Sequence, residues 1–245
     1  MWLDDPNSEH ANCLENVTIQ PHSKVEKGHI MTYIWINPVT ANLYEPDALN
    51  KYLARHGYER FETAGDWMGE VKEKYRQAVA NSTSPVMDVR CPKIKALLEE
   101  VGVTAEVILP EIDPILIHCA REGSEREDLQ GEEKLITTPC KALADMGNGL
   151  NLPDTRFVSW KQFVEMLGEE PPRKPLHVSP IPPGFFDDLG IQTVSVTGKE
   201  EIRNYLKNKL TSDVQLVEML ICEDGCHHGD GIQWNDELSP GFKEV

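Results

Sequence analysis

The sequence has no long hydrophobic run and few basic residues for its length. No apolar stretch approaches the roughly 20 residues that cross a bilayer, and the acidic start MWLDDPNSEHANC lacks the apolar core of a secretory signal. The 24 Lys and Arg residues are outnumbered by 41 Asp and Glu residues, which gives a formal net charge of −17. Nucleic acids and anionic membranes bind Lys and Arg patches. We therefore expect a cytoplasmic protein with no membrane span and no nucleic-acid partner.

Cysteine is also scarce, and its setting argues against a disulfide framework. The chain has six cysteines in 245 residues, whereas disulfide frameworks are typical of small secreted proteins. The cysteines are therefore interpreted as thiolates for metal binding or chemistry. Cys119 is the exception, because it lies on the apolar side of a predicted helix and is interpreted as a small buried hydrophobe. The role of Cys13, in the N-terminal segment, stays open.

Strand-like and helix-like segments alternate through the central part of the chain. Apolar, β-branched runs predict strands at 29–36, 84–89, 134–140, 193–198 and 214–221. Amphipathic segments between these runs predict helices, and such alternation implies parallel sheets with crossover connections. The predicted class is therefore α/β. Residues 1–28, which show no periodicity, are predicted to be an N-terminal arm, and residues 233–245 a C-terminal tail.

Three of the predicted strands end at a cysteine. Cys91, Cys140 and Cys222 stand at these strand ends, and Cys226 follows four residues after Cys222. In parallel sheets, ligands collect at the carboxyl ends of the strands. Four thiolates at a common edge suit zinc or an iron–sulfur cluster, because both accept four cysteine ligands. The single CxxxC pair, in place of two CxxC knuckles, favours the cluster modestly.

The loop that carries Cys222 and Cys226 is rich in glycine and contains two histidines. Glycines such as Gly229 allow backbone to pass close to a bulky cluster, and N–H groups there can stabilise its negative charge. His227 and His228 suit a metal-ligand or proton-relay role. Adjacent histidines on a loop are more often exposed or only hydrogen-bonded, so both interpretations stay open.

Three segments carry a resemblance to a known family. They are VRCP at 89–92, TPCKAL at 138–143 and EMLICEDGCHHGDG at 218–231. In this order they resemble the three cysteine loops of the catalytic domain of iron-only ([FeFe]) hydrogenases, whose patterns are S-C-C-P or S-A-C-P, P-C-x-A-K-K, and E-x-M-A-C-P-G-G-C-x-x-G-G-G. The chain is more similar to the sensory or hydrogenase-like branch than to the active enzymes. The similarity covers roughly residues 29–232, and the third loop is its most specific part.

The resemblance implies a cofactor, a ligand set and a fold. The implied ligands of one [4Fe–4S] cluster are Cys91, Cys140, Cys222 and Cys226, and Cys226 would also occupy the position that bridges to a diiron unit. The implied fold is two lobes, each a small, mainly parallel sheet flanked by helices, with the metal site in the cleft between them. The first lobe would span 29–133, and the second lobe with the cluster loop would span 134–232. Neighbours that would form the surrounding shell are Arg90, Lys141, His227, His228 and Gly229.

Departures from the family pattern argue against a diiron subsite. Arg90 stands where the family has a proton-relay cysteine, and Leu143 where a lysine binds a diiron cyanide. Thr138 replaces a methionine two residues before Cys140. An anionic cyanide without a buried donor would be left unpaired at a cost of a few kcal/mol. The chain also lacks the cysteines of accessory ferredoxin modules, so we expect the cubane without hydrogen chemistry.

Three functional hypotheses follow. The leading one is a [4Fe–4S] protein for electron transfer or redox sensing, working with a redox partner protein or within a larger complex. The alternative is an oxidoreductase that uses the cubane with another metal or substrate at the vacant diiron position, where Arg90 could bind an anionic substrate. The third is a structural interaction protein in which zinc or a cluster joins the lobes.

Overall fold

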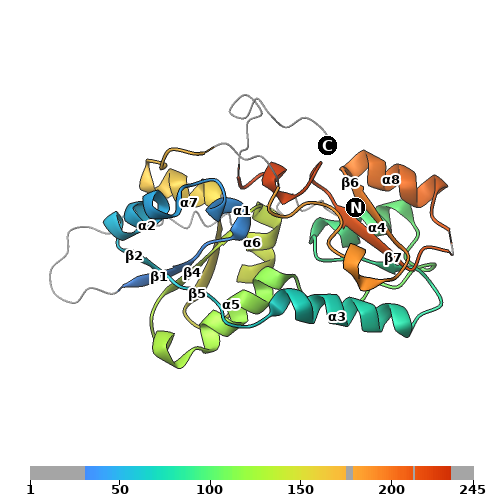
Figure 1. The fold of residues 1–245 in the computed structure, drawn as a ribbon, viewed down its shortest axis with the longest axis horizontal. Helices are drawn as coiled ribbons and strands as arrows, with labels where there is room; N and C mark the ends of the chain where they lie inside the picture. The colour runs from blue at the N-terminus through green and yellow to red at the C-terminus, as the bar shows by residue number, and fades with distance from the viewer. Residues whose placement is uncertain (1–30, 175–178, 212, 233–245) are drawn as a thin grey trace, which may run out of the picture.

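Two separate parallel sheets form the framework of the computed structural model, which describes residues 31–174, 179–211 and 213–232 (Figure 1). The first sheet has the order β2-β1-β4-β5 and the second the order β3-β7-β6, and all the strand pairings within these two sheets are parallel. The predicted α/β class with small parallel sheets is therefore confirmed. The arm predicted at 1–28 and the tail predicted at 233–245 lie outside the described residues, as does Cys13.

The first sheet is covered by helices on both faces. Its strands are β1 (Thr32–Trp35), β2 (Tyr58–Arg60), β4 (Lys134–Thr138) and β5 (Thr155–Ser159). Its helices are α1 (Pro38–Ala41), α2 (Pro46–Arg55), α5 (Ile115–Glu125), α6 (Lys141–Asn148) and α7 (Trp160–Leu167). Ile34 and Trp35 are neighbours on β1 and point to opposite faces of the sheet. Ile34 packs with α1, α2 and α7, and Trp35 packs with α5 and α6. Burial on both faces explains the continuous apolar strands.

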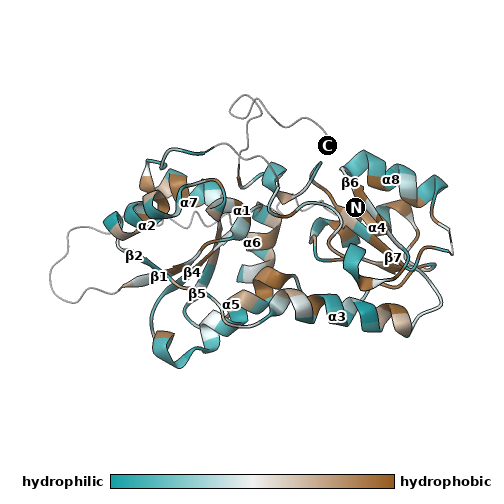
Figure 2. Ribbon diagram, viewed as in Figure 1, coloured by the Kyte–Doolittle hydropathy of each residue, from teal (hydrophilic) through white to brown (hydrophobic). Residues whose placement is uncertain are grey.

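The second sheet is shorter and is also packed on both faces. Its strands are β3 (Val86–Met87), β6 (Thr193–Thr197) and β7 (Leu216–Leu220), and its helices are α4 (Lys93–Val101) and α8 (Lys199–Asn208). Met87 and Val217 pack with α4 and α8, whereas Val86 and Leu216 pack against the long helix α3 (Trp67–Ala80). Figure 2 shows the apolar residues concentrated along the strands and on the inward sides of the helices.

Helix α3 connects the two halves of the molecule. Its N-terminal residue Trp67 stacks on His118 of α5, with ring centroids 5.3 Å apart, while Tyr75 lies in the core beneath the second sheet. Figure 1 shows the helix running from beside α5 to the second sheet. The helix therefore fixes how the two sheets sit relative to each other.

The strands of the two sheets interleave along the sequence. β3 pairs with β7 through the register Val86 with Leu216, and β4 pairs with β1 through Ile34 with Leu135. Each sheet thus draws strands from both parts of the chain, so the predicted boundary between 29–133 and 134–232 does not coincide with the division between the sheets. No helix of the described residues is long and apolar enough to cross a membrane.

Candidate metal centre

The predicted ligands sit where strands of both sheets end. Cys91 lies between β3 and α4, and Cys222 lies two residues beyond β7, which is the neighbour of β3 in the second sheet. Cys140 lies two residues beyond β4 of the first sheet, as the N-cap of α6. Cys226 begins a short 3₁₀ helix, η3 (Cys226–His228). The strand-end placement expected from the sequence is present for Cys91, Cys140 and Cys222.

Each of three cysteines packs against a different hydrophobic core. Cys91 packs with the α4–α8 core, Cys140 with the α5–α6 core, and Cys226 with the core under α1, α2 and α7. All four candidate ligands carry free thiols of intermediate exposure. The loops that carry them therefore reach a region bordered by both sheets.

The four thiols influence one another electrostatically. Burial raises the pKa of Cys226 far above its usual value, and the thiols of Cys222, Cys91 and Cys140 raise it further. Burial likewise raises the pKa of Cys140 to about 11, with Cys91 contributing in the same direction. The pKa values of Cys91 and Cys222 are also raised, with burial as the largest cause. The metal-free protein therefore holds neutral thiols at pH 7, and binding a cationic metal centre would release protons.

Backbone N–H groups partly offset this burial. The N–H groups of Ile221 and Lys93 favour the thiolate of Cys91, and the N–H of Leu143 favours the thiolate of Cys140. Lys93 and Leu143 lie in the first turns of α4 and α6, where helix N–H groups have no partner within the helix. These donors face the side on which an anionic sulfur would form.

The donor set fits an iron–sulfur cluster in type and number. In the described part of the chain, no three His, Cys, Asp or Glu side chains are arranged to hold one metal ion. A zinc site needs four ligands at about 2–2.3 Å from a single centre. A [4Fe–4S] cluster instead takes its four thiolates at four separate irons.

The cysteine loop lies directly against the segment that carries Cys140. A Cβ at Gly229 would meet the carbonyl oxygen of Pro139 at 2.2 Å, and one at Gly231 would meet Ser159 Cβ at 2.7 Å. The Gly231 N–H donates to the Pro139 carbonyl oxygen at 3.0 Å. Only glycine allows this approach, so the glycines of the loop serve to bring Cys226 and Cys140 into one region.

Arg90 is committed to neighbouring carboxylates. Its guanidinium donates to Asp88 at 2.7 and 2.9 Å and to Glu218 at 3.1 Å, and it lies 3.9 Å from the ring centroid of Phe185. Asp88 and Glu218 are buried, and the Arg90 side chain is 10% exposed. Burial alone would lower the pKa of Arg90, but the charge and hydrogen bonds of Asp88, together with smaller contributions from Tyr75 and Glu218, outweigh it and raise the pKa. The guanidinium therefore forms ion pairs with two buried carboxylates.

The other predicted neighbours take ordinary structural positions. The Lys141 ammonium pairs with Asp145 one turn along α6 at 2.6 Å, on the exposed surface. His228 donates from Nδ1 to the Glu223 carbonyl oxygen at 2.8 Å. His227 is buried, and its ring lies 4.0 Å from that of His228. The structure thus brings these residues beside the cysteines without assigning them a ligand role.

Leu143, Thr138 and Cys119 take structural roles near the Cys140 segment. Leu143 is buried in the α5–α6 core, and Thr138 Oγ1 donates to the Cys140 carbonyl oxygen at 2.8 Å. Cys119 is 4% exposed in the same core, where its thiol accepts from Thr63 Oγ1 at 3.7 Å, which confirms its interpretation as a buried hydrophobe. Leu143 therefore contributes apolar packing to this core.

The sequence interpretation missed two charged residues, Lys93 and Asp230. Asp230 Oδ2 accepts from Lys93 Nζ at 3.0 Å, and Asp230 Oδ1 accepts from the Lys141 N–H at 2.9 Å. Lys93 acts electrostatically on the thiols of Cys140 and Cys222. Two features of the sequence could have identified the pair. Lys93 lies two residues after Cys91, and Asp230 interrupts the glycines of the cysteine loop.

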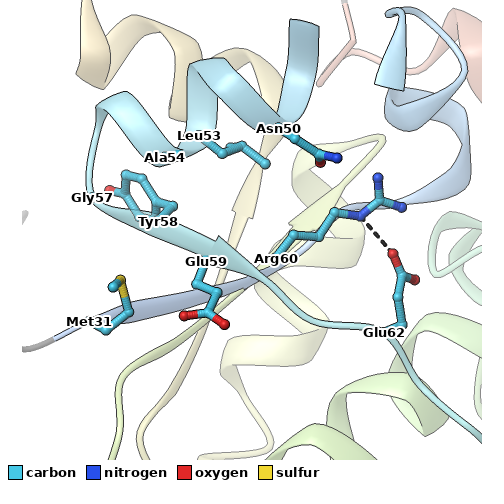
Figure 3. A pocket seen from close by; sticks show the side chains of 9 residues that line it. All are labelled: Met31, Asn50, Leu53, Ala54, Gly57, Tyr58, Glu59, Arg60 and Glu62. Carbon is cyan, nitrogen blue, oxygen red and sulfur yellow. Dashed lines mark ion pairs between the residues drawn. The ribbon is translucent and has the colours of Figure 1, made fainter. Parts of the chain in front are cut away.

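Two surface pockets lie away from the cysteines. One, of about 520 Å³, lies between α2 and β2 and is lined by Asn50, Tyr58 and Arg60 among others; Figure 3 shows Arg60 paired with Glu62 at its edge. The other, of about 550 Å³, lies beside β5 and includes Arg156.

No protein-family model matches the chain, and no curated protein matches it.

Proposed function

We propose that this protein binds one [4Fe–4S] cluster through Cys91, Cys140, Cys222 and Cys226, and uses it for electron transfer or redox sensing. The observation that carries the proposal is the set of four free, partly buried thiols that interact electrostatically across three strand-end loops. When bound, such a cluster accepts and releases one electron at a potential set by its surroundings. The protein supplies thiolates, glycine backbone and helix N–H groups.

Two residues support a protein that keeps the cubane without hydrogen chemistry. Leu143 presents an apolar side chain in a packed core, so it offers no donor to an anionic diiron ligand. Arg90 is already paired with Asp88 and Glu218. Binding an anionic substrate through Arg90 would require separating these buried pairs, which disfavours the alternative oxidoreductase.

The scaffold relationship belongs to the same proposal. We infer a divergent hydrogenase-like domain because the three cysteine segments follow parallel strands in the order expected from the resemblance. A redox partner protein, or a larger complex in the cytoplasm, would exchange electrons with the cluster.

The test is anaerobic reconstitution of the full chain with iron and sulfide, followed by metal analysis, EPR and infrared spectra. We expect about four irons and four sulfides per chain, a reducible cubane signal, and no CO or CN⁻ bands. Cys226→Ala should lower iron content and abolish the wild-type signal. Cys119→Ala is the matched control, because this buried cysteine lies in the α5–α6 core, and it should retain full iron content.

Two results would overturn the proposal. Unchanged iron content in Cys226→Ala would remove this residue from the ligand set. Additional iron, or infrared bands from CO and CN⁻, would mean that a second metal unit is bound, and the alternative oxidoreductase would replace electron transfer as the leading function.

A further inference from the structure

Asp230 joins the two helix starts that follow Cys91 and Cys140. Its Oδ1 accepts from the backbone N–H of Lys141, the first residue of α6, at 2.9 Å. Its Oδ2 accepts from Nζ of Lys93, the first residue of α4, at 3.0 Å. α6 packs on the first sheet and α4 on the second. One carboxylate, carried on the cysteine loop, therefore connects all three ligand-bearing segments.

We propose that Asp230 and Lys93 form a bridging charge pair that positions the cysteine loops and sets the local charge felt by the metal centre. The inference rests on the proposed function of the four cysteines. Asp230 acts here as a positioning residue. Its carboxylate supplies the acceptor for the first N–H of α6, whose N-cap is Cys140.

The two members of the pair carry opposite charges at the same place. Lys93 places a positive charge, and Asp230 a negative charge, beside the segments that carry Cys91, Cys140 and Cys226. Reduction adds one negative charge to a bound cluster. Removing the carboxylate would leave the ammonium uncompensated and stabilise the reduced state, and removing the ammonium would do the reverse.

The opposite signs separate an electrostatic role from a merely structural one. Loss of either side chain breaks the same 3.0 Å bridge, so structural loosening alone would move both variants in one direction. The two side chains are 41% and 53% exposed. Salt therefore screens their charges, and the electrostatic effect should shrink as ionic strength rises.

The experiment measures the midpoint reduction potential of the reconstituted full chain at low and high salt. Asp230→Asn keeps an oxygen acceptor for the Lys141 N–H but removes the charge, and it should shift the potential upward. Lys93→Met keeps the aliphatic stem and should shift the potential downward. The double variant should fall between them. Shifts of the same sign, or no shift in either single variant, would overturn the electrostatic part of the inference.

A matched ion pair on α3 provides the control. Lys74 and Glu70 are 2.7 Å apart and 40% and 44% exposed, close to the values of the bridging pair. The pair lies on the helix that packs beneath the second sheet and against α5. Lys74→Met and Glu70→Gln should leave the potential unchanged. Shifts as large as those of the bridge variants would show a general charge effect and contradict a specific role.

A second measurement does not need the cluster. Amide hydrogen exchange of the reduced, metal-free chain reports directly on the Lys141 N–H. In Asp230→Ala this amide should exchange roughly two- to tenfold faster than in the wild type, as expected for one lost hydrogen bond, whereas Asp230→Asn should change it little. Equal exchange in all three would refute the positioning role. A wild-type protein that takes up no iron would refute the proposed function instead. The exchange result would then still show whether Asp230 positions the start of α6.

Discussion

Replacing Gly229 by alanine tests whether the cysteine loop must lie against the Pro139–Cys140 segment. A Cβ at this position would come 2.2 Å from the carbonyl oxygen of Pro139 and 3.0 Å from that of Cys226. The backbone angles of Gly229 are φ −63° and ψ 145°, which alanine adopts without strain. The cost of the substitution is therefore steric, and the loop must move away from Pro139 to relieve it.

The magnitude follows from three contributions. Overpacking a well-packed site costs about 1–3 kcal/mol. Moving the loop also weakens the 3.0 Å bond from the Gly231 N–H to the Pro139 carbonyl, which contributes about 0.5–1.5 kcal/mol. Alanine lowers the conformational entropy of the unfolded chain, which offsets about 0.4–1 kcal/mol of this loss of stability. We expect a net loss of about 2 kcal/mol, or a fall in Tm of roughly 4–8 °C.

Urea unfolding of the reduced, metal-free protein measures this loss, with Gly149→Ala as the matched control. Gly149 ends α6 with φ −63°, and a Cβ there would have its nearest contact at 3.4 Å, an ordinary van der Waals distance. The control should be as stable as the wild type or slightly more stable. If Gly229→Ala proves as stable as Gly149→Ala, the close approach of the two loops is refuted.

Two further predictions concern buried charge and pH. Arg90→Met should reduce the free energy of unfolding by about 3–5 kcal/mol, because it leaves the buried carboxylates of Asp88 and Glu218 without their cation. A loss below about 1 kcal/mol, measured by urea unfolding, would contradict the buried pairing. Burial, and then the charge of Lys74, lowers the pKa of His118, so the unfolded chain binds a proton more readily than the folded chain. The free energy of unfolding should therefore decrease as pH falls below about 6.5. The free energy of unfolding of the His118→Phe variant should decrease less over the same range. Parallel pH profiles for the two proteins would show that His118 does not contribute.

The sequence by itself determined the secondary structure around the site. The apolar, β-branched runs at 134–140 and 214–221 correspond to β4 and β7, because burial on both faces of a parallel sheet leaves a continuous hydrophobic signal. Since the cysteines follow such runs directly, their position at strand ends is a local property of the sequence. The burial of Cys119 followed equally from its position on the apolar side of a helix.

Only the tertiary structure decided which strands pair and which charges meet. β3 pairs with β7 across a long separation in sequence, and nothing local in Val86-Met87 identifies that neighbour. The bond between Lys93 and Asp230 spans 137 residues, and Arg90 reaches Glu218 across 128 residues. Local patterns report whether a segment is buried and how it repeats. The partner of a charged side chain is decided by packing between distant segments, which leaves no periodic trace in the sequence.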